Sequence, residues 1–327
     1  MIRGVIPVLP TPLGDDGTPD DAGLRAVIDF AIGHGMDAVL VLGSNGEAPY
    51  LRTDEKERIL MTACAHARGR IPVIAGVIEH GTDEAVHLAR LAERHGAAAA
   101  LVALPSYYPL ALADVLGHYR RLCAAVSLPV FYYHFPACTR LALTPAEVAE
   151  VCALDGITGL KDSVLGRREI RAHLRRIRKP GFAVYSGTIY LYPEVHRMGG
   201  AGVICPVPLL APTDALALRD ALGCGDDRAA ARARARLYET LPVMAGRFEL
   251  PLPLLRAGLR VAARVGVGAS AAGGMPHAAV KEALRARGVP IGTAVRGPLR
   301  PLDERRRRQV QALVARLDSG AGAPAIP

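Results

Sequence analysis

Residues 157–163, which read ITGLKDS, form a short apolar run that ends in polar side chains. The run is bounded by Gly156 and Gly166 and is too short for an independent helix, so we interpret it as a buried β-strand. Lys161 stands near its carboxyl end. Barrels of parallel strands carry their active sites at this end, so the run predicts both a strand and a candidate reactive group.

Seven similar runs occur in the first 208 residues, and longer amphipathic stretches separate them. The runs are residues 4–10, 38–43, 72–77, 99–105, 129–136, 182–188 and 202–208. Regular alternation of strands with helices predicts a parallel sheet. Eight such units in about 215 residues match the number and size of a (β/α)8 TIM barrel. An open doubly wound sheet is the alternative, but the loop at residues 11–20 lacks the glycine-rich pattern that follows the first strand of such sheets.

The sequence after residue 208 contains no further strand pattern. Helical patterns follow at residues 212–222, 227–245, 252–265, 275–288 and 302–317. We therefore expect an α/β protein in two parts, a barrel at residues 1–225 and a C-terminal helical region at residues 226–327.

The basic residues of the chain are nearly all arginine. Of 40 basic residues, against 31 acidic ones, only four are lysine: Lys56, Lys161, Lys179 and Lys281. Arginine stays charged in a protein, whereas a desolvated lysine can become a neutral nucleophile. Lys56 lies in a charged helix start, Lys179 in a loop and Lys281 on a helix, so none of these three predicts chemistry. Lys161 alone emerges from a predicted barrel strand, and an ion pair with Asp162 or Glu47 is its alternative role.

The same survey argues against several classes of protein. No run of eighteen apolar residues occurs, and the first twelve residues lack a signal-peptide pattern, so we expect a cytoplasmic protein that does not enter a membrane. The six cysteines form no CxxC pair and the histidines form no metal-binding motif, so we expect no metal site. Arginine-rich residues 231–236 and 305–308 have no interleaved aromatic residues, so we expect no nucleic-acid partner despite a net charge of +9.

Two further segments place polar groups near the predicted position of Lys161. Side chains alternate along a strand, so only one of Tyr132 and Tyr133 points into the barrel, where it would lie beside Lys161 and exchange protons. The loop at residues 43–47, GSNGE, offers a hydroxyl and backbone N–H groups ahead of a helix, an arrangement suited to binding a carboxylate.

Together these residues resemble the dihydrodipicolinate synthase and N-acetylneuraminate lyase family of class I, pyruvate-type aldolases. The likeness is carried by GSNGE, by the Y-x-x-P pattern from Tyr133 to Pro136, and by GLKDS at residues 159–163. It extends over nearly the whole chain, including residues 70–77, 105–109, 185–187 and 295–302. The resemblance implies a TIM-barrel lyase that uses no metal or organic cofactor and assembles as a homotetramer, a dimer of dimers.

The resemblance also implies the catalytic residues. Lys161 is expected to form a Schiff base with a 2-keto acid, and the Y-x-x-P register selects Tyr133 over Tyr132 as the catalytic tyrosine. Ser44 and Tyr133 are expected to relay protons together with Tyr107, which would come from the adjacent subunit.

Other positions are implied to bind the substrate. Ser44 and Asn45 match the site for the keto acid carboxylate, although many relatives have a second hydroxyl residue where this chain has Asn45. Gly187 and Ile204 match backbone positions that line the pyruvate end. His134 replaces a common asparagine and is expected to face away from the site, as a packing residue.

Two departures from the family pattern bear on the substrate. Dihydrodipicolinate synthases carry an arginine at the position of Cys138, so activity in the lysine pathway requires Arg140 to take over that role. Sialic acid lyases carry an acidic pair where this chain has Ile189 and Tyr190. The residues of the GSNGE and LKDS motifs are most similar to those of 4-hydroxy-2-oxoglutarate aldolases. The alternatives are 4-hydroxy-tetrahydrodipicolinate synthase, a dehydratase of keto-deoxy sugar acids that uses the same imine, and a protein that binds keto acids without turnover.

Overall fold

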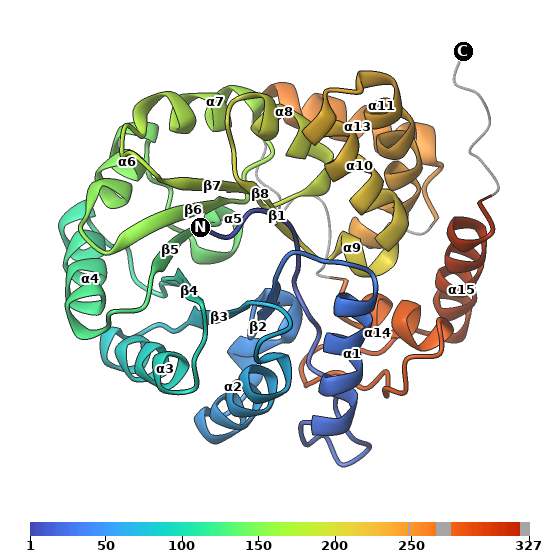
Figure 1. Ribbon diagram of the computed structural model, residues 1–327, viewed down its shortest axis with the longest axis horizontal. Helices are drawn as coiled ribbons and strands as arrows, with labels where there is room; N and C mark the ends of the chain where they lie inside the picture. Colours follow the sequence, from blue (N-terminus) through green and yellow to red (C-terminus); the bar gives the residue numbers. More distant parts are fainter. Residues whose placement is uncertain (248, 266–275, 321–327) are drawn as a thin grey trace.

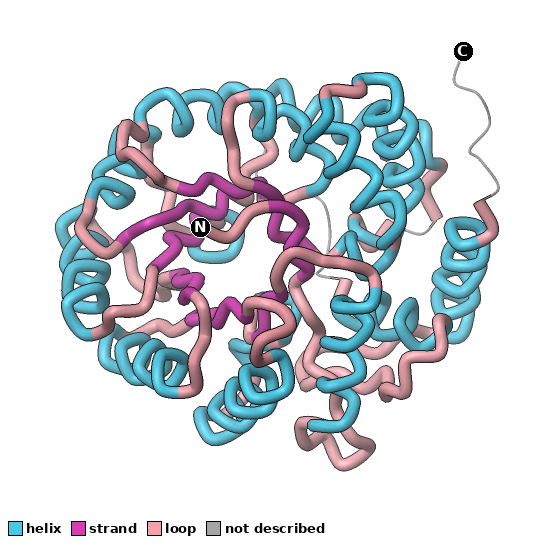
Figure 2. The backbone as a smooth tube through the Cα atoms, in the orientation of Figure 1, coloured by secondary structure: helices cyan, strands magenta, loops and turns pink. Residues whose placement is uncertain are grey.

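The computed structural model describes residues 1–247, 249–265 and 276–320. Eight parallel strands form a nearly closed barrel inside a ring of helices (Figures 1 and 2). The strands are β1 (Gly4–Pro7), β2 (Val39–Val41), β3 (Val73–Ile78), β4 (Ala99–Ala103), β5 (Val130–His134), β6 (Ile157–Asp162), β7 (Ala183–Ser186) and β8 (Gly202–Cys205). All eight predicted strands are confirmed. Most are shorter than the apolar runs that predicted them, because the last residues of those runs leave the sheet and enter the loops.

Hydrogen bonding runs round the barrel from β1 through β8 and back to β2. The barrel nearly closes between β1 and β2, where the backbone N–H of Leu9, just after β1, donates a hydrogen bond to the carbonyl of Leu40 at 2.8 Å. Strands β5 and β6 are neighbours, as expected, and their register places Tyr133 opposite Lys161 and His134 opposite Asp162.

Strand alternation divides the buried apolar residues into two groups. One group fills the inside of the barrel and includes Ile6, Leu40 and Ile74, whereas the other lies between the strands and the helices. Tyr133 belongs to the inner group and Tyr132 to the outer group. One strand therefore sends neighbouring tyrosines to opposite faces.

The ring of helices packs against the outer group. It consists of α1 (Asp21–Gly33), α2 (Thr53–Ala67), α3 (Thr82–Arg94), α4 (Leu112–Ala125), α6 (Pro145–Ala153), α7 (Arg167–Arg176), α8 (Tyr192–Arg197) and α10 (Pro212–Cys224). Short helical turns occupy the loops: η1 (Ser44–Gly46), η2 (Ala48–Tyr50), α5 (Pro136–Thr139), η3 (Ile189–Leu191) and α9 (Val207–Leu210). Helix α6 shows how the sequence sets such a start, because Thr144 and Glu147 form a capping box.

The C-terminal part is helical and gathers on one side of the barrel (Figure 1). Its elements are α11 (Asp227–Leu237), η4 (Tyr238–Thr240), α12 (Leu241–Met244), α13 (Leu252–Val265), α14 (His277–Ala286) and α15 (Glu304–Asp318). The prediction of one helix over residues 227–245 is wrong, since a 3-10 turn interrupts it just before Pro242, which has no N–H to continue the helical bonding. Met275, the first residue of another predicted helix, lies outside the described residues. The division at residue 225 falls between α10 and α11 and stays a prediction.

None of the helices in the described ranges combines the length and the apolar character that a membrane-spanning segment needs.

Candidate active site

A cavity of about 410 Å³ opens at the carboxyl ends of the strands. Six of the residues expected to form the site line it: Ser44, Asn45, Tyr133, Lys161, Gly187 and Ile204. They come from three strands and two loops that are far apart in the sequence. Barrel closure brings them together because parallel strands end at the same rim.

Lys161 and Tyr133 form the centre of this cavity. Lys161 is only 2% exposed, and its Nζ lies 4.0 Å from the centroid of the Tyr133 ring. Within the described residues, neither this Nζ nor the Tyr133 hydroxyl forms a hydrogen bond with a hydroxyl, carbonyl or carboxylate group. An amine and a phenol are thus held side by side, both available to a bound molecule.

Both carboxylates that offered an alternative role for Lys161 are engaged elsewhere. Glu47 pairs with Lys281 at 2.6 Å, and Asp162 pairs with His173 at 2.7 Å. The ion pair between Lys161 and either group is therefore excluded by this geometry. Lys161 is the one lysine, within the described ranges, that the structure leaves without an anionic or carbonyl partner.

The other three lysines have structural contacts that their sequence positions did not reveal. Lys56 pairs with Glu79, and Lys179 donates to the carbonyls of Leu154 and Ile157, each at 2.7 Å. Lys281 is completely buried. A lysine on a helix was expected to be unremarkable, but this one is a core residue.

Ser44 and Asn45 lie on η1, directly after β2. Asn45 is 4% exposed and its Oδ1 has no hydrogen-bond partner in the described part of the chain. A buried amide without a partner is costly, so its availability at the cavity wall favours a bound polar ligand. The loop is held from outside by His277 of α14, whose Nε2 lies 2.8 Å from the carbonyl oxygen of Ser44.

Gly187 permits a close approach between β6 and β7. A Cβ atom there would lie 2.0 Å from the Ser163 Oγ, so a larger residue would displace the wall. Its N–H already donates to the carbonyl of Asp162 at 2.7 Å, which leaves its own carbonyl for a substrate. Ile204 lines the same end from β8.

Two expected site residues lie elsewhere. Tyr107 is 80% exposed and packs edge-on against Tyr108 rather than lining the cavity of its own chain. Arg140 is exposed, at the end of α5 with a φ of 60°, whereas Cys138 lines the cavity. In this conformation Arg140 does not replace an arginine at position 138.

Much of the cavity lining is apolar, which the sequence survey did not anticipate. Phe135 and Leu165 follow strands β5 and β6, and the C-terminal part supplies a wall of Leu241, Met244 and Leu259. Burial raises the pKa of the Cys205 thiol to about 12, so this lining cysteine remains neutral. Tyr190 directs its hydroxyl to Thr240 at 2.6 Å and contributes a mainly apolar ring. Lys161 is the sole charged residue among the described residues that line the cavity.

Comparison with known proteins agrees with this geometry. Residues 1–271 match the dihydrodipicolinate synthetase family. A protein of Methylococcus capsulatus named 4-hydroxy-tetrahydrodipicolinate synthase is 36% identical over 241 residues, which cover 74% of this chain and 82% of the relative. A protein of the same name from Thiobacillus denitrificans is 37% identical over 210 residues, covering 64% and 71% of the two chains.

Solved structures show the same fold. YagE of Escherichia coli, a prophage protein of the dihydrodipicolinic acid synthase family solved in complex with pyruvate, superposes with a TM-score of 0.83 at 28% identity. That alignment covers 97% of this chain and 99% of YagE. Dihydrodipicolinate synthase of Aquifex aeolicus gives a TM-score of 0.81 at 26% identity, covering 97% and 98%. This chain therefore belongs to the dihydrodipicolinate synthetase family, whose members are class I lyases.

Proposed function

We propose that this protein is a Schiff-base lyase that cleaves or forms a carbon–carbon bond in a small 2-keto acid, with pyruvate as product or substrate. The observation that carries the proposal is the buried Lys161 amine, which has no anionic partner and lies 4.0 Å from the Tyr133 ring centroid. An amine at the wall of a cavity, without a partner among the described residues, is available to attack the carbonyl of a bound keto acid.

In the cleavage direction the substrate is a 4-hydroxy-2-keto acid. The neutral Nζ of Lys161 attacks the C2 carbonyl, whose oxygen leaves as water, and a protonated imine forms. The C4 hydroxyl then loses its proton, the C3–C4 bond breaks, and its electron pair moves into the imine to give an enamine and an aldehyde. Protonation at C3 and hydrolysis release pyruvate and return the free amine. Because the imine itself accepts the electrons, we expect this reaction to need no metal or organic cofactor.

Tyr133 is the residue best placed to move these protons. Its phenol lies beside Lys161 and can accept the C4 proton and return it to carbon, with Ser44 and a Tyr107 of another subunit completing the relay. Ser44 and Asn45 are proposed to hold the substrate carboxylate through the hydroxyl, the amide and the η1 backbone. Gly187 and Ile204 support the pyruvate end through their backbone atoms.

The apolar lining of the cavity bears on the second substrate. A distal carboxylate would need a cation to offset its desolvation, and the described lining residues provide none besides Lys161. Leu241, Met244 and Leu259 instead favour an uncharged aldehyde with apolar surface. The lining thus argues against a 4-hydroxy-2-oxoglutarate substrate. It also argues against the 4-hydroxy-tetrahydrodipicolinate synthase reaction, because this chain has Cys138 at the position of the family arginine. Dehydration of a keto-deoxy acid through the same imine is the second candidate reaction.

We further propose a cytoplasmic homotetramer, assembled as a dimer of dimers. The six cysteines are all free, as is common in a reducing compartment. Tyr107 is exposed and does not line the cavity of its own chain, which fits a role in the site of a neighbouring subunit.

Borohydride reduction in the presence of pyruvate tests the imine directly. We expect an adduct of pyruvate mass on the peptide that contains Lys161, and no adduct in Lys161→Met. Lys179→Met is the matched control, because Lys179 bonds only to backbone carbonyls and its loss should leave the adduct intact. An adduct on any other lysine, or none, would refute the assignment.

A panel of 2-keto acids then separates the two reactions. Pyruvate release from 4-hydroxy-2-keto acids with apolar tails supports aldol cleavage. A product that retains all the carbon atoms of the substrate supports dehydration instead.

A further inference from the structure

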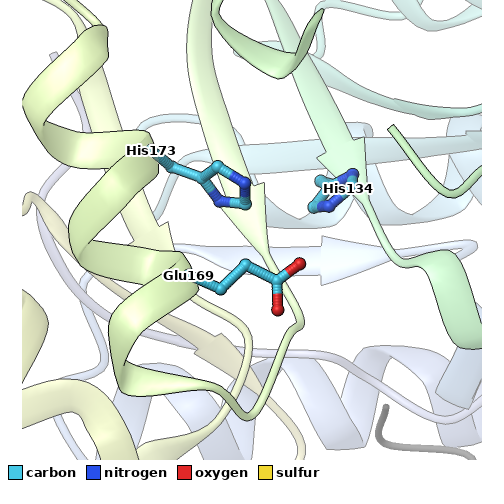
Figure 3. Close-up of side chains that lie close together, drawn as sticks. All are labelled: His134, Glu169 and His173. Atoms are coloured by element: carbon cyan, nitrogen blue, oxygen red, sulfur yellow. The ribbon is translucent and has the colours of Figure 1, made fainter. Parts of the chain in front are cut away.

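A cluster of ligand-type side chains lies behind the active site, on the outer face of the barrel. It contains His134 on β5 together with Glu169 and His173 on α7, and one ligand atom of each lies within 4.8 Å of the other two (Figure 3). The two imidazole rings lie edge to face, with centroids 5.2 Å apart, and the Glu169 carboxylate reaches toward the space beside them (Figure 3). The proposed imine chemistry uses none of the three residues.

Both histidines have an unsatisfied nitrogen in this space. His134 is 1% exposed and His173 is completely buried, yet neither Nε2 has a hydrogen-bond partner among the described residues. Buried nitrogens of this kind are nearly always paired, so two of them in one place indicate a bound group. A packing role accounts for a histidine whose two nitrogens are both bonded, and it does not account for this pair.

The Nδ1 atoms of the two histidines form hydrogen bonds of the kind that orient metal-binding histidines. His173 Nδ1 lies 2.7 Å from the Asp162 carboxylate, and His134 Nδ1 lies 3.1 Å from the Tyr132 hydroxyl. With Nδ1–H donating to the carboxylate or to the phenol oxygen, each ring presents its Nε2 lone pair. Metal-ligating histidines typically donate their other N–H to such a carboxylate or oxygen, which fixes the tautomer and the ring orientation.

We propose that His134, Glu169 and His173 bind a first-row divalent cation, with Zn²⁺ as the ion that suits them best. Two imidazoles and one carboxylate are a common protein ligand set for zinc, and they leave a fourth position for water. Ligands around a tetrahedral zinc ion lie about 3.4 Å apart, so the ligand atoms, which all lie within 4.8 Å of one another, must approach by at most about 1.4 Å. Glu169 is half-buried, so its side chain has room to adjust and gives the ion a path from solvent.

The groups around the cluster agree with this assignment. Glu169 is one carboxylate of the cluster, and Asp162, which bonds to His173, supplies a second carboxylate close by.

The place of the site gives the ion a positioning role. His134 directly follows Tyr133 on β5, and Asp162 directly follows Lys161 on β6, on the face of the sheet opposite the cavity. An ion here would tie α7 to the strand end that carries Tyr133, and through His173 and Asp162 to the strand end that carries Lys161. It would not touch the substrate.

Metal binding by the full chain tests the proposal. The protein is first treated with a chelator and then dialysed against Zn²⁺. Elemental mass spectrometry should then find one zinc ion per chain. Glu169→Gln keeps the shape of the half-buried ligand and should weaken Zn²⁺ binding by at least about tenfold. His134→Asn should have the same effect. His87→Gln removes an exposed histidine of α3 and is the matched control that should bind as the parent does.

Two further measurements identify the ligands and guard against misfolding. Co²⁺ in the site should give tetrahedral visible bands without a thiolate charge-transfer band, which separates it from binding at the free cysteines. Zn²⁺ should raise the thermal unfolding temperature of the parent and of His87→Gln, but not of Glu169→Gln. Absence of stoichiometric zinc, equal binding by all variants, or a thiolate spectrum would overturn the proposal and leave a bound water as the partner of the two nitrogens. The borohydride adduct on Lys161 is independent of these outcomes.

Discussion

Lys281 Nζ donates a hydrogen bond to Glu47 Oε1 at 2.6 Å, and both side chains are completely buried. The bond joins α14 of the C-terminal part to the loop that carries Ser44 and Asn45. Glu47 is held in a left-handed conformation, with a φ of 59°, and its Oε2 accepts the backbone N–H of Arg296 at 2.6 Å. Burial lowers the pKa of Lys281, while the charge of Glu47 opposes that effect. The C-terminal part therefore positions a segment of the candidate site.

Removal of one partner of this pair should be costly. Lys281→Met leaves a buried carboxylate without its cation, and we expect the free energy of unfolding to fall by about 3–5 kcal/mol in urea denaturation. Arg121→Met is the control, because Arg121 pairs with Asp83 on the surface and its loss should cost less than about 1 kcal/mol. Equal stability of the parent and Lys281→Met would contradict the role given to the pair.

Loss of the Tyr133 hydroxyl should affect turnover more than imine formation. We expect Tyr133→Phe to lower kcat by about 10²–10⁴, because proton transfer by a positioned group contributes that much, while the borohydride adduct with pyruvate persists. Tyr119→Phe serves as the control, since Tyr119 is buried but bonds to the carbonyl of Val102, away from the cavity. If adduct formation and turnover fall equally in Tyr133→Phe, the proton-transfer role is wrong.

A cation at position 138 should change substrate preference. Cys138→Arg puts a guanidinium at the cavity wall, where it can bind the distal carboxylate of a dicarboxylic 2-keto acid. A charge-assisted hydrogen bond of this kind is worth about 1.5–3 kcal/mol, so we expect kcat/KM for such substrates to rise roughly 10–150-fold. Cys138→Gln, which is polar but uncharged, should not produce this rise. A parent that already prefers dicarboxylic substrates would refute the assignment of an apolar partner.

The exposed Tyr107 should matter only in an assembled protein. We expect Tyr107→Phe to lower kcat, whereas Tyr108→Phe, at a neighbouring position that is 73% exposed, should have little effect. Light scattering should detect the oligomer at assay concentration, and dilution below its dissociation should lower activity per chain. Full activity as a monomer would count against a contribution from the second subunit.

Acid should destabilise the fold through His118. Burial lowers the pKa of His118 from 6.5 to about 4, so the folded state disfavours the proton that the unfolded state accepts. The stability is complete above about pH 6.5 and is lost as the pH falls toward 4, by about 2–3 kcal/mol at pH 4.5. Urea denaturation at pH 7 and at pH 4.5 should show a smaller loss in His118→Gln. The same loss in both proteins would exclude His118 as the titrating group.

The fold was predictable because its signals are local. Each strand of a parallel barrel is buried on both faces and reads as a short apolar run, and each helix has its own periodicity. Pro242 shows the limit of that approach, because the apolar pattern continues through residues 227–245 although the backbone bonding does not. The sequence also predicted strands that were too long at their carboxyl ends, because the apolar runs continue into loops that pack against the rim of the barrel.

The meeting of Lys161, Tyr133 and Ser44 at one cavity was predictable for a different reason. Tyr133 and Lys161 lie near the ends of β5 and β6, and Ser44 follows β2. Strand order makes β5 and β6 neighbours, so motif and topology together place the amine beside the phenol. The scarcity of lysine drew attention to Lys161, and this lysine does line the cavity. The same reasoning gave Lys281 no role, because a helix position does not reveal which face of the helix is buried.

The amino-acid sequence by itself determined the eight-stranded barrel, the family and the lysine at the end of β6. Tertiary structure alone decided which groups meet across long stretches of chain: Glu47 with Lys281, the apolar wall of Leu241, Met244 and Leu259, and the cluster of His134, Glu169 and His173. Glu169 and His173 are one helical turn apart on α7, but their third partner lies on β5, so no spacing in the sequence signals the set. Periodicity is a property of neighbours along the chain, whereas ion pairs, pockets and metal ligands depend on the directions of side chains from separate elements once the barrel has closed.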